Sequence, residues 1–132
     1  MKRENLNNRN WVWSRIKSFK FAFIGFWTLL KTQQSAWCHI AFTLAVIVAG
    51  LFFGLSQSEW CWLVLAMTAV WSAEAFNTSI EFLSDVASPQ YHPLIKHAKD
   101  VAAAAVLITV IGSLAIGALT IGPYLLKFLE SR

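Results

Sequence analysis

The sequence has little charge and little cysteine. Of its 132 residues, 14% are charged and 57% are hydrophobic, whereas soluble domains carry about 25% charged residues. This shortfall argues against an ordinary soluble domain and indicates a chain that lies in lipid. The two cysteines are too few for a disulfide framework.

Several motifs that would assign a soluble function are also missing. The chain has no G-x-G-x-x-G and no G-x-x-x-x-G-K-[ST], which excludes the soluble-kinase and P-loop classes. It has no G-x-S-x-G either. A zinc pattern is absent, because His92 and His97 are five residues apart and do not share a helix face.

Three hydrophobic runs occupy most of the remaining chain. Residues 37–55 and 101–126 contain no Asp, Glu, Lys or Arg, and each approaches or exceeds the roughly 20 helical residues that cross a bilayer core of about 30 Å. The middle run, 60–73, spans only if its helix continues into an acidic segment, where acids are costly and usually functional. We therefore expect an all-α integral membrane protein, one membrane domain over 1–132, with spanning helices at 37–55, 60–83 and 101–126.

Residues 11–31 are predicted to form a basic amphipathic helix that lies in the membrane interface. Its apolar residues recur at steps of three and four, which predicts a stripe on one face: Val12, Ile16, Phe19, Phe23, Phe26 and Leu30. A signal peptide is the alternative, because a basic start precedes an apolar run. No cleavage site of small residues follows cleanly, and Lys20 and Lys31 bracket that run.

The basic residues also predict the orientation. The connection Ser56–Glu59 has no Lys or Arg, whereas the connection 85–100 holds Lys96 and Lys99, so the second should face the cytoplasm. The N-terminus then lies inside and the two cysteines lie at opposite membrane faces. The basic N-terminal quarter, which includes Lys2 and Arg3, suits an anionic leaflet better than nucleic acid.

The helix that continues the middle run carries an unusual polar face. Glu74, Asn77, Glu81 and Asp85 are separated by three, four and four residues. At 3.6 residues per turn the three acids fall within about 40° of one another. A solvent-exposed charged face is the alternative, but such a face would carry charges of both signs and include Lys or Arg. Three acids repel one another, so a cation should complete the site.

Magnesium with phosphate is the cation chemistry that fits this face, because Mg²⁺ prefers carboxylate and phosphate oxygens. Lys99 and Asp100, just before the last hydrophobic run, could supply a phosphate contact and a further acid.

The segment from Glu74 to Asp85 reads E-A-F-N-T-S-I-E-F-L-S-D. It resembles the signature of the prokaryotic diacylglycerol and undecaprenol kinases, E-x-x-N-[ST]-[SA]-[LIV]-E-x-x-x-D. Residues 18–25, 88–92 and 98–103 match the family as well, so the resemblance covers roughly residues 13–122.

The resemblance implies a surface helix and three membrane helices, assembled as a homotrimer in the bacterial inner membrane. It implies active sites at the cytoplasmic boundary that neighbouring subunits share. The implied reaction is the ATP-dependent phosphorylation of a membrane lipid alcohol, diacylglycerol or undecaprenol, with Mg²⁺ and with no nucleic-acid partner.

The resemblance also assigns roles to residues. Glu74 matches the general base, Glu81 a metal ligand, and Asn77 and Asp85 polar residues that support the site. Gln33 stands where the family has a second metal-binding Glu. Six residues match nucleotide-contacting positions: Arg15, Gln90, Tyr91, His92, Lys99 and Asp100. Three residues near the first span are expected to bind lipid: Ser35, Trp37 and His39.

The N-terminal half departs from the family pattern Glu-x-Asn-x-Arg-x-His. Here the corresponding residues are Gln33, Ser35, Trp37 and His39, so only the histidine remains. A non-catalytic relative that binds lipid or nucleotide as a regulator is therefore the second hypothesis. The retention of Glu74 and the other residues of the acidic face favours an active enzyme. A channel or transporter has little support, because the acids gather at one membrane face.

Overall fold

The computed structural model describes residues 8–131 and contains four helices and no strand within that range. The helices are α1 (Asn8–Thr32), α2 (Gln34–Phe53), α3 (Gln57–Ala87) and α4 (Pro93–Glu130). The expectation of an all-α chain is confirmed. The predicted first span, 37–55, corresponds to α2, which ends at Phe53 because Gly54 adopts φ 66°.

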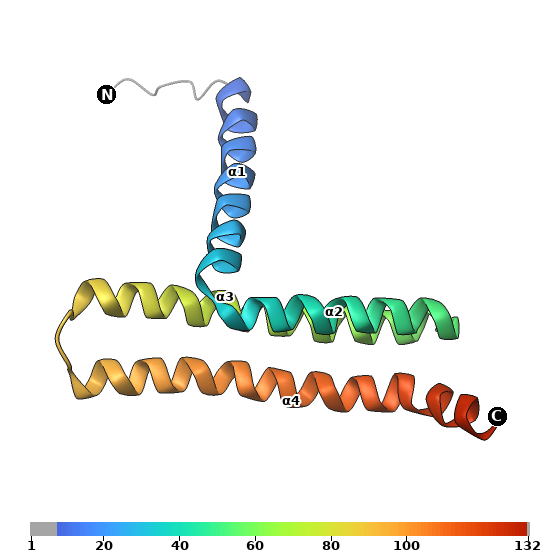
Figure 1. The fold of residues 1–132 in the computed structure, drawn as a ribbon. Helices are drawn as coiled ribbons and strands as arrows, with labels where there is room; N and C mark the ends of the chain where they lie inside the picture. Colours follow the sequence, from blue (N-terminus) through green and yellow to red (C-terminus); the bar gives the residue numbers. More distant parts are fainter. Residues whose placement is uncertain (1–7, 132) are drawn as a thin grey trace.

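The helices α2, α3 and α4 run side by side, and α1 leaves this layer steeply (Figure 1). Among the described helices, α2 and α4 are long and apolar enough to cross a membrane. Helix α3 does not meet that criterion, in line with its short apolar run. Three spans therefore stay a prediction.

Most large apolar side chains are exposed in the single chain. Phe42, Leu51, Leu107 and Leu119 are each more than half exposed. The buried apolar residues are few and include several small ones: Leu29, Ala36, Leu55, Leu63, Ala66, Val70 and Ala102. Lipid tails are as apolar as leucine, so membrane helices associate through close packing at small residues. The small core and the apolar exterior suit a chain that is surrounded by lipid or by further copies.

The apolar surface of α1 is broader than the predicted stripe. Ile16, Phe19 and Phe23 of the stripe are exposed, and so is Phe21 on another part of the helix. Among the side chains of α1 that the structure describes, Leu29 is buried; it lies outside the predicted stripe and close to the junction with α2. The side chain of Val12 and the N-terminal Lys2 and Arg3 lie outside the described residues.

The connection between α3 and α4 covers residues 88–92. Helix α3 ends at Ala87, and Pro93 occupies the first turn of α4, where its missing N–H costs nothing. His92 caps this helix, because its Nδ1 accepts a hydrogen bond from the Leu94 amide at 3.3 Å. This cap fixes the start of α4 next to the acidic end of α3.

The opposite end of the bundle is closed by a capping box. The Ser56 side chain accepts from the Glu59 amide, while the Ser56 hydroxyl and amide donate to the Glu59 carboxylate. These two hydrogen bonds from Ser56 hold the pKa of Glu59 below its ordinary value. Tyr124 of α4 also donates to Glu59 Oε2 at 3.1 Å, which ties α4 to the start of α3.

Gly50 allows the ring of Trp60 to lie directly on the backbone of α2. A Cβ at Gly50 would stand 2.7 Å from two ring carbons of Trp60. Contacts of this length are repulsive, so a larger residue forces the indole to move. Gly50 is therefore a packing position in the last turn of α2, against the start of α3.

Replacing Gly50 with Ala should destabilise the protein by about 1 kcal/mol, because the added methyl group overpacks the contact with Trp60. Thermal unfolding in detergent micelles measures the effect. Gly112→Ala is the matched control, since a Cβ there meets nothing within 4 Å and Ala favours a helix over Gly. Equal melting temperatures for the two variants would contradict this packing role.

Candidate functional site

The first turn of α2 faces the middle of α3, near the end of α1. Ala36 is fully buried at this crossing, which lets the two helix backbones approach. Gln33, the residue before α2, has extended backbone angles, φ −108° and ψ 117°. The side chains of Gln33 and Ser35 both reach acids of α3, so sequence-predicted residues from separate segments meet here.

Glu81 is held by two amide groups. Gln33 Nε2 donates to Glu81 Oε2 at 2.7 Å, and Asn77 Nδ2 donates to Oε1 at 3.2 Å. Both oxygens of this half-buried carboxylate therefore accept a hydrogen bond. Asn77 Oδ1 is buried and has no hydrogen-bond partner within the described chain.

Glu74 is 3% exposed, and each of its carboxylate oxygens faces a residue of α2. The Ser35 hydroxyl donates to Oε1. His39 Nε2 lies 3.7 Å from Oε2. A buried carboxylate held in this way is restricted in rotation, and charge on it is strongly felt by any group placed nearby.

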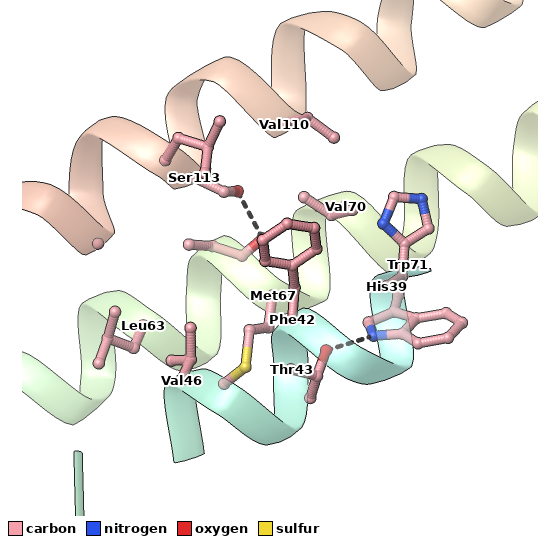
Figure 2. A pocket seen from close by; sticks show the side chains of 13 residues that line it. His39, Phe42, Thr43, Val46, Leu63, Met67, Val70, Trp71, Val110 and Ser113 are labelled. Carbon is pink, nitrogen blue, oxygen red and sulfur yellow. Dashed lines mark hydrogen bonds between the residues drawn. The ribbon is translucent and has the colours of Figure 1, made fainter. Parts of the chain in front are cut away.

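His39 is supported by a set of aromatic and hydroxyl contacts. Its ring meets the Trp71 ring edge-on, with centroids 5.9 Å apart. Trp71 Nε1 in turn donates to Thr43 Oγ1 at 3.2 Å, as Figure 2 shows. The Phe26 ring of α1 packs on Trp71 at 5.4 Å. Three helices thus fix the surroundings of His39.

An apolar cavity of about 140 Å³ begins at His39 and Trp71 and passes between α2, α3 and α4 (Figure 2). It runs past Leu63 to Gly117, and Ser113, one of its few polar residues, donates to the Ala66 carbonyl at 3.1 Å. A larger open hollow between α1 and α3 shares Trp71 with it. Apolar space therefore reaches His39, whose Nε2 lies 3.7 Å from the Glu74 carboxylate.

Five of the six residues expected to contact a nucleotide, all except Arg15, lie around the connection between α3 and α4. Lys99 Nζ bonds Asp85 Oδ1 at 3.0 Å, across the two helices. Asp100 pairs with Lys96 at 2.6 Å, a partner that the sequence analysis did not assign to the site although it stands four residues away. The first pair places a cation at the acidic end of α3, whereas the second lies within the first turns of α4.

The connection itself carries the remaining nucleotide candidates of this region. Tyr91 is 79% exposed. Gln90 accepts a hydrogen bond through its backbone carbonyl from the Ser88 hydroxyl at 2.8 Å. His92 caps α4, so it has a structural function whatever else it binds.

Arg15 and Trp37 are not brought to the carboxylates within one chain. Arg15 precedes the end of α1 at Thr32 by 17 residues, about 25 Å along the helix axis. Trp37 is 63% exposed, unlike His39 two residues later. The three predicted lipid-binding residues thus separate: Ser35 and His39 face Glu74, and Trp37 points elsewhere.

Sequence reasoning missed Trp71 and Thr43, which support His39. Their signal was the helical period, because Trp71 precedes Glu74 by three residues and Thr43 follows His39 by four. Thr78 was also missed, and its hydroxyl donates to the backbone carbonyl of Glu74 at 2.9 Å.

The donor set around Glu81 suits magnesium only in part. No group of three or more His, Cys, Asp or Glu side chains that could hold a metal occurs in the described part of the chain. The oxygen atoms nearby are the Glu81 carboxylate, the unpaired Asn77 Oδ1 and the Gln33 amide. Oxygen ligands of this kind, completed by phosphate and water, are those that Mg²⁺ accepts.

The sequence model of the family described as prokaryotic diacylglycerol kinase matches residues 20–121. A relative from Bacillus subtilis (strain 168), named undecaprenol kinase, is 35% identical over 122 residues, which cover 92% of this chain and 99% of the relative.

Two further relatives carry the name diacylglycerol kinase. The protein of Synechocystis sp. is 34% identical over 85% of this chain and 65% of its own length. The protein of Helicobacter pylori is 31% identical over 74% of this chain and 81% of its own length.

Proposed function

Because the chain belongs to the prokaryotic diacylglycerol kinase family and is therefore a lipid kinase, we propose that it transfers the γ-phosphoryl group of ATP to the hydroxyl group of a membrane lipid alcohol. The observation that carries the proposal is the buried Glu74 carboxylate, held by Ser35 of α2 and faced by His39, which also lines an apolar cavity. A lipid with its tail in apolar surroundings can present a hydroxyl group to this carboxylate.

Glu74 is the proposed general base. As the lipid oxygen forms its bond to the γ-phosphorus, its proton passes to the Glu74 carboxylate, and the bond from the γ-phosphorus to the bridging oxygen of ADP breaks. Phosphoryl transfer depends mainly on positioning and charge stabilisation, with a base that orients the nucleophile. The Ser35 hydroxyl positions the base by holding Oε1.

The residues that would hold Mg²⁺ are Glu81, Asn77 and Gln33. Bound there with ATP, the ion would offset the charge of the transferred phosphoryl group. Glu81 supplies the one carboxylate, Asn77 offers an unpaired oxygen, and Gln33 is a neutral ligand in place of a second acid. Mg²⁺ sites often use one or two carboxylates with phosphate oxygens, so Glu81 suffices for binding.

The nucleotide is proposed to lie near the connection between α3 and α4. Lys99 would exchange Asp85 for a phosphate oxygen when ATP arrives, since both residues of this pair are well exposed. Asp100, Gln90, Tyr91 and His92 complete the expected contacts. They lie near the same end of the α3–α4 hairpin, which supports a common ligand.

We further propose three membrane spans, with α3 as the third, and a homotrimer in the bacterial inner membrane. The single chain exposes many apolar side chains along α2, α3 and α4. The length of α1 carries Arg15 away from Glu74 and Glu81 at the end of that helix, so its expected nucleotide contact fits a site shared with a neighbouring subunit. Both features support assembly.

Undecaprenol is the lipid alcohol to test first. The relative named undecaprenol kinase matches 99% of its own length, whereas the two named diacylglycerol kinase match 65% and 81%. Diacylglycerol is the second substrate to test, because it offers the same chemistry of a single hydroxyl group at the membrane boundary.

Replacing Glu74 with Gln should lower turnover about 10²- to 10⁴-fold, because the amide cannot accept the proton. ATP-dependent phosphorylation of undecaprenol and of diacylglycerol measures the loss. Glu130→Gln at the exposed end of α4 is the control for the same change and should act as the unmodified protein does. Near-normal turnover in Glu74→Gln would remove Glu74 from the role of base.

Replacing Gln33 with Glu should lower the Mg²⁺ concentration needed for half-maximal activity. A second negative charge beside the ion attracts it more strongly in a partly buried site than in water, because the effective dielectric constant is lower there. Without the ion, two carboxylates in contact repel. We therefore expect Gln33→Glu to have a lower melting temperature than the unmodified protein without Mg²⁺. Addition of Mg²⁺ should raise the melting temperature of the variant by more than that of the unmodified protein.

Gln34→Glu is the matched control for this experiment, since Gln34 is exposed one residue further on. An Mg²⁺ midpoint that Gln33→Glu leaves unchanged would place residue 33 away from the metal. Inactivity of both proteins at every Mg²⁺ concentration and with both lipids would favour the non-catalytic hypothesis, which the loss of the family Glu at this position motivates.

The two free, exposed cysteines test the orientation. Cys38 near the start of α2 should react with a membrane-impermeant thiol reagent only from the cytoplasmic side, and Cys61 near the start of α3 only from outside. Single-cysteine variants, Cys38→Ser and Cys61→Ser, identify which thiol is labelled in intact and opened cells. Labelling of both thiols from one side contradicts the proposed spans.

A further inference from the structure

His39 has a buried nitrogen with no hydrogen-bond partner in the part of the chain that the structure describes. This atom, Nε2, lies 3.7 Å from Glu74 Oε2, and the exposed fractions of the two side chains are 14% and 3%. An unmade hydrogen bond at a buried polar atom is costly. The geometry therefore calls for a partner, and the carboxylate oxygen is already in front of it.

The ring of His39 is held in this direction by its neighbours. Trp71 packs edge-on against it, and the Trp71 indole is itself fixed by its hydrogen bond to Thr43. Figure 2 shows His39 and Trp71 together at the end of the cavity. A histidine that served only as lining for a lipid tail would gain nothing from an Nε2 aimed at an acid.

We propose that His39 is a positioning residue for Glu74 and not a ligand of the lipid. An ionised carboxylate only accepts hydrogen bonds, so the tautomer that serves this role carries its proton on Nε2. Catalytic hydrogen bonds are often long in the absence of substrate and tighten in the reacting complex. A shift of about 0.7 Å brings the 3.7 Å contact to an ordinary hydrogen-bond length.

Ser35 and His39 then act as a pair on the two oxygens of one carboxylate. Ser35 donates to Oε1 and His39 to Oε2, which stops the carboxylate from turning about its last bond. The remaining lone pairs are left in a fixed direction for the proton of the lipid hydroxyl group. Both donors belong to α2, so α2 orients a base that belongs to α3.

This assignment rests on the proposed function, in which Glu74 is the base. It differs from the expectation drawn from the sequence, in which His39 binds the lipid. The two roles predict different effects on the kinetic constants. Loss of a positioning residue lowers kcat with little change in the KM for lipid, whereas loss of a lipid ligand raises that KM.

The test compares His39→Gln with His39→Asn in the full chain, with undecaprenol and with diacylglycerol as substrates. The glutamine amide can place an N–H near the position of Nε2, and the shorter asparagine amide cannot. His39→Asn should lower kcat on the order of 10- to 100-fold, the scale of a misplaced catalytic group, with the lipid KM within about two-fold. His39→Gln should recover most of the loss.

Two controls sharpen the comparison. His97→Gln makes the same substitution at an exposed histidine of α4 and should leave both constants unchanged. In a Glu74→Gln background, His39→Asn should cause no further loss, because a residue that acts through Glu74 has nothing left to position. Equal losses for Asn and Gln, or a raised lipid KM with kcat unchanged, would overturn the assignment.

A nuclear magnetic resonance measurement decides the point without activity. The ¹⁵N shifts of the His39 imidazole should report a proton on Nε2 and should move in Glu74→Gln, while those of His97 should stay constant. Inactivity of the unmodified protein with both lipids overturns the proposed function. An unmoved His39 signal in Glu74→Gln overturns the pairing of His39 with Glu74, whatever the activity.

Discussion

The site depends on the crossing of the first turn of α2 over the middle of α3. At this crossing Gln33 donates to Glu81 and Ser35 donates to Glu74, so two carboxylates of one helix are held by two neighbouring residues of another. Ala36, in the same first turn of α2, is fully buried, so there is no free space for a larger side chain at this position. A larger side chain there would separate the helices, and both hydrogen bonds would be lost together.

The membrane setting explains why so much depends on a few polar contacts. Helices in lipid gain little from burying apolar surface against one another, and most apolar side chains of this chain remain on its exterior. Close approach at small residues and hydrogen bonds between helices must then fix the arrangement. The Tyr124–Glu59 bond does so at one end of the bundle, and the Lys99–Asp85 pair ties α3 to α4 at the other.

The sequence predicted the contents of the acidic face but not its partners. A fixed helical period turns the spacing of Glu74 and Glu81 into a shared direction, and it places Asn77 next to Glu81. No such rule states which residue of α2 meets which acid of α3, because that depends on how far the helices slide along each other. For the same reason Thr43 and Trp71, 28 residues apart, could not be paired beforehand.

Glutamine at position 33 affects the site without a metal ion as well as the site with a metal ion bound. A carboxylate there would face Glu81 at hydrogen-bonding distance, and two like charges so close cannot both stay ionised without a cation. The amide instead donates to Glu81 and satisfies it. In the absence of metal, uncharged donors therefore satisfy the two carboxylates: Gln33 and Asn77 bond Glu81, and Ser35 bonds Glu74. A cation that binds there must displace or reorient the Gln33 amide, because its N–H points at the oxygen that the cation would take. Binding thus competes with a hydrogen bond that a second acid could not form, which is the physical reason to expect weaker metal binding in this chain.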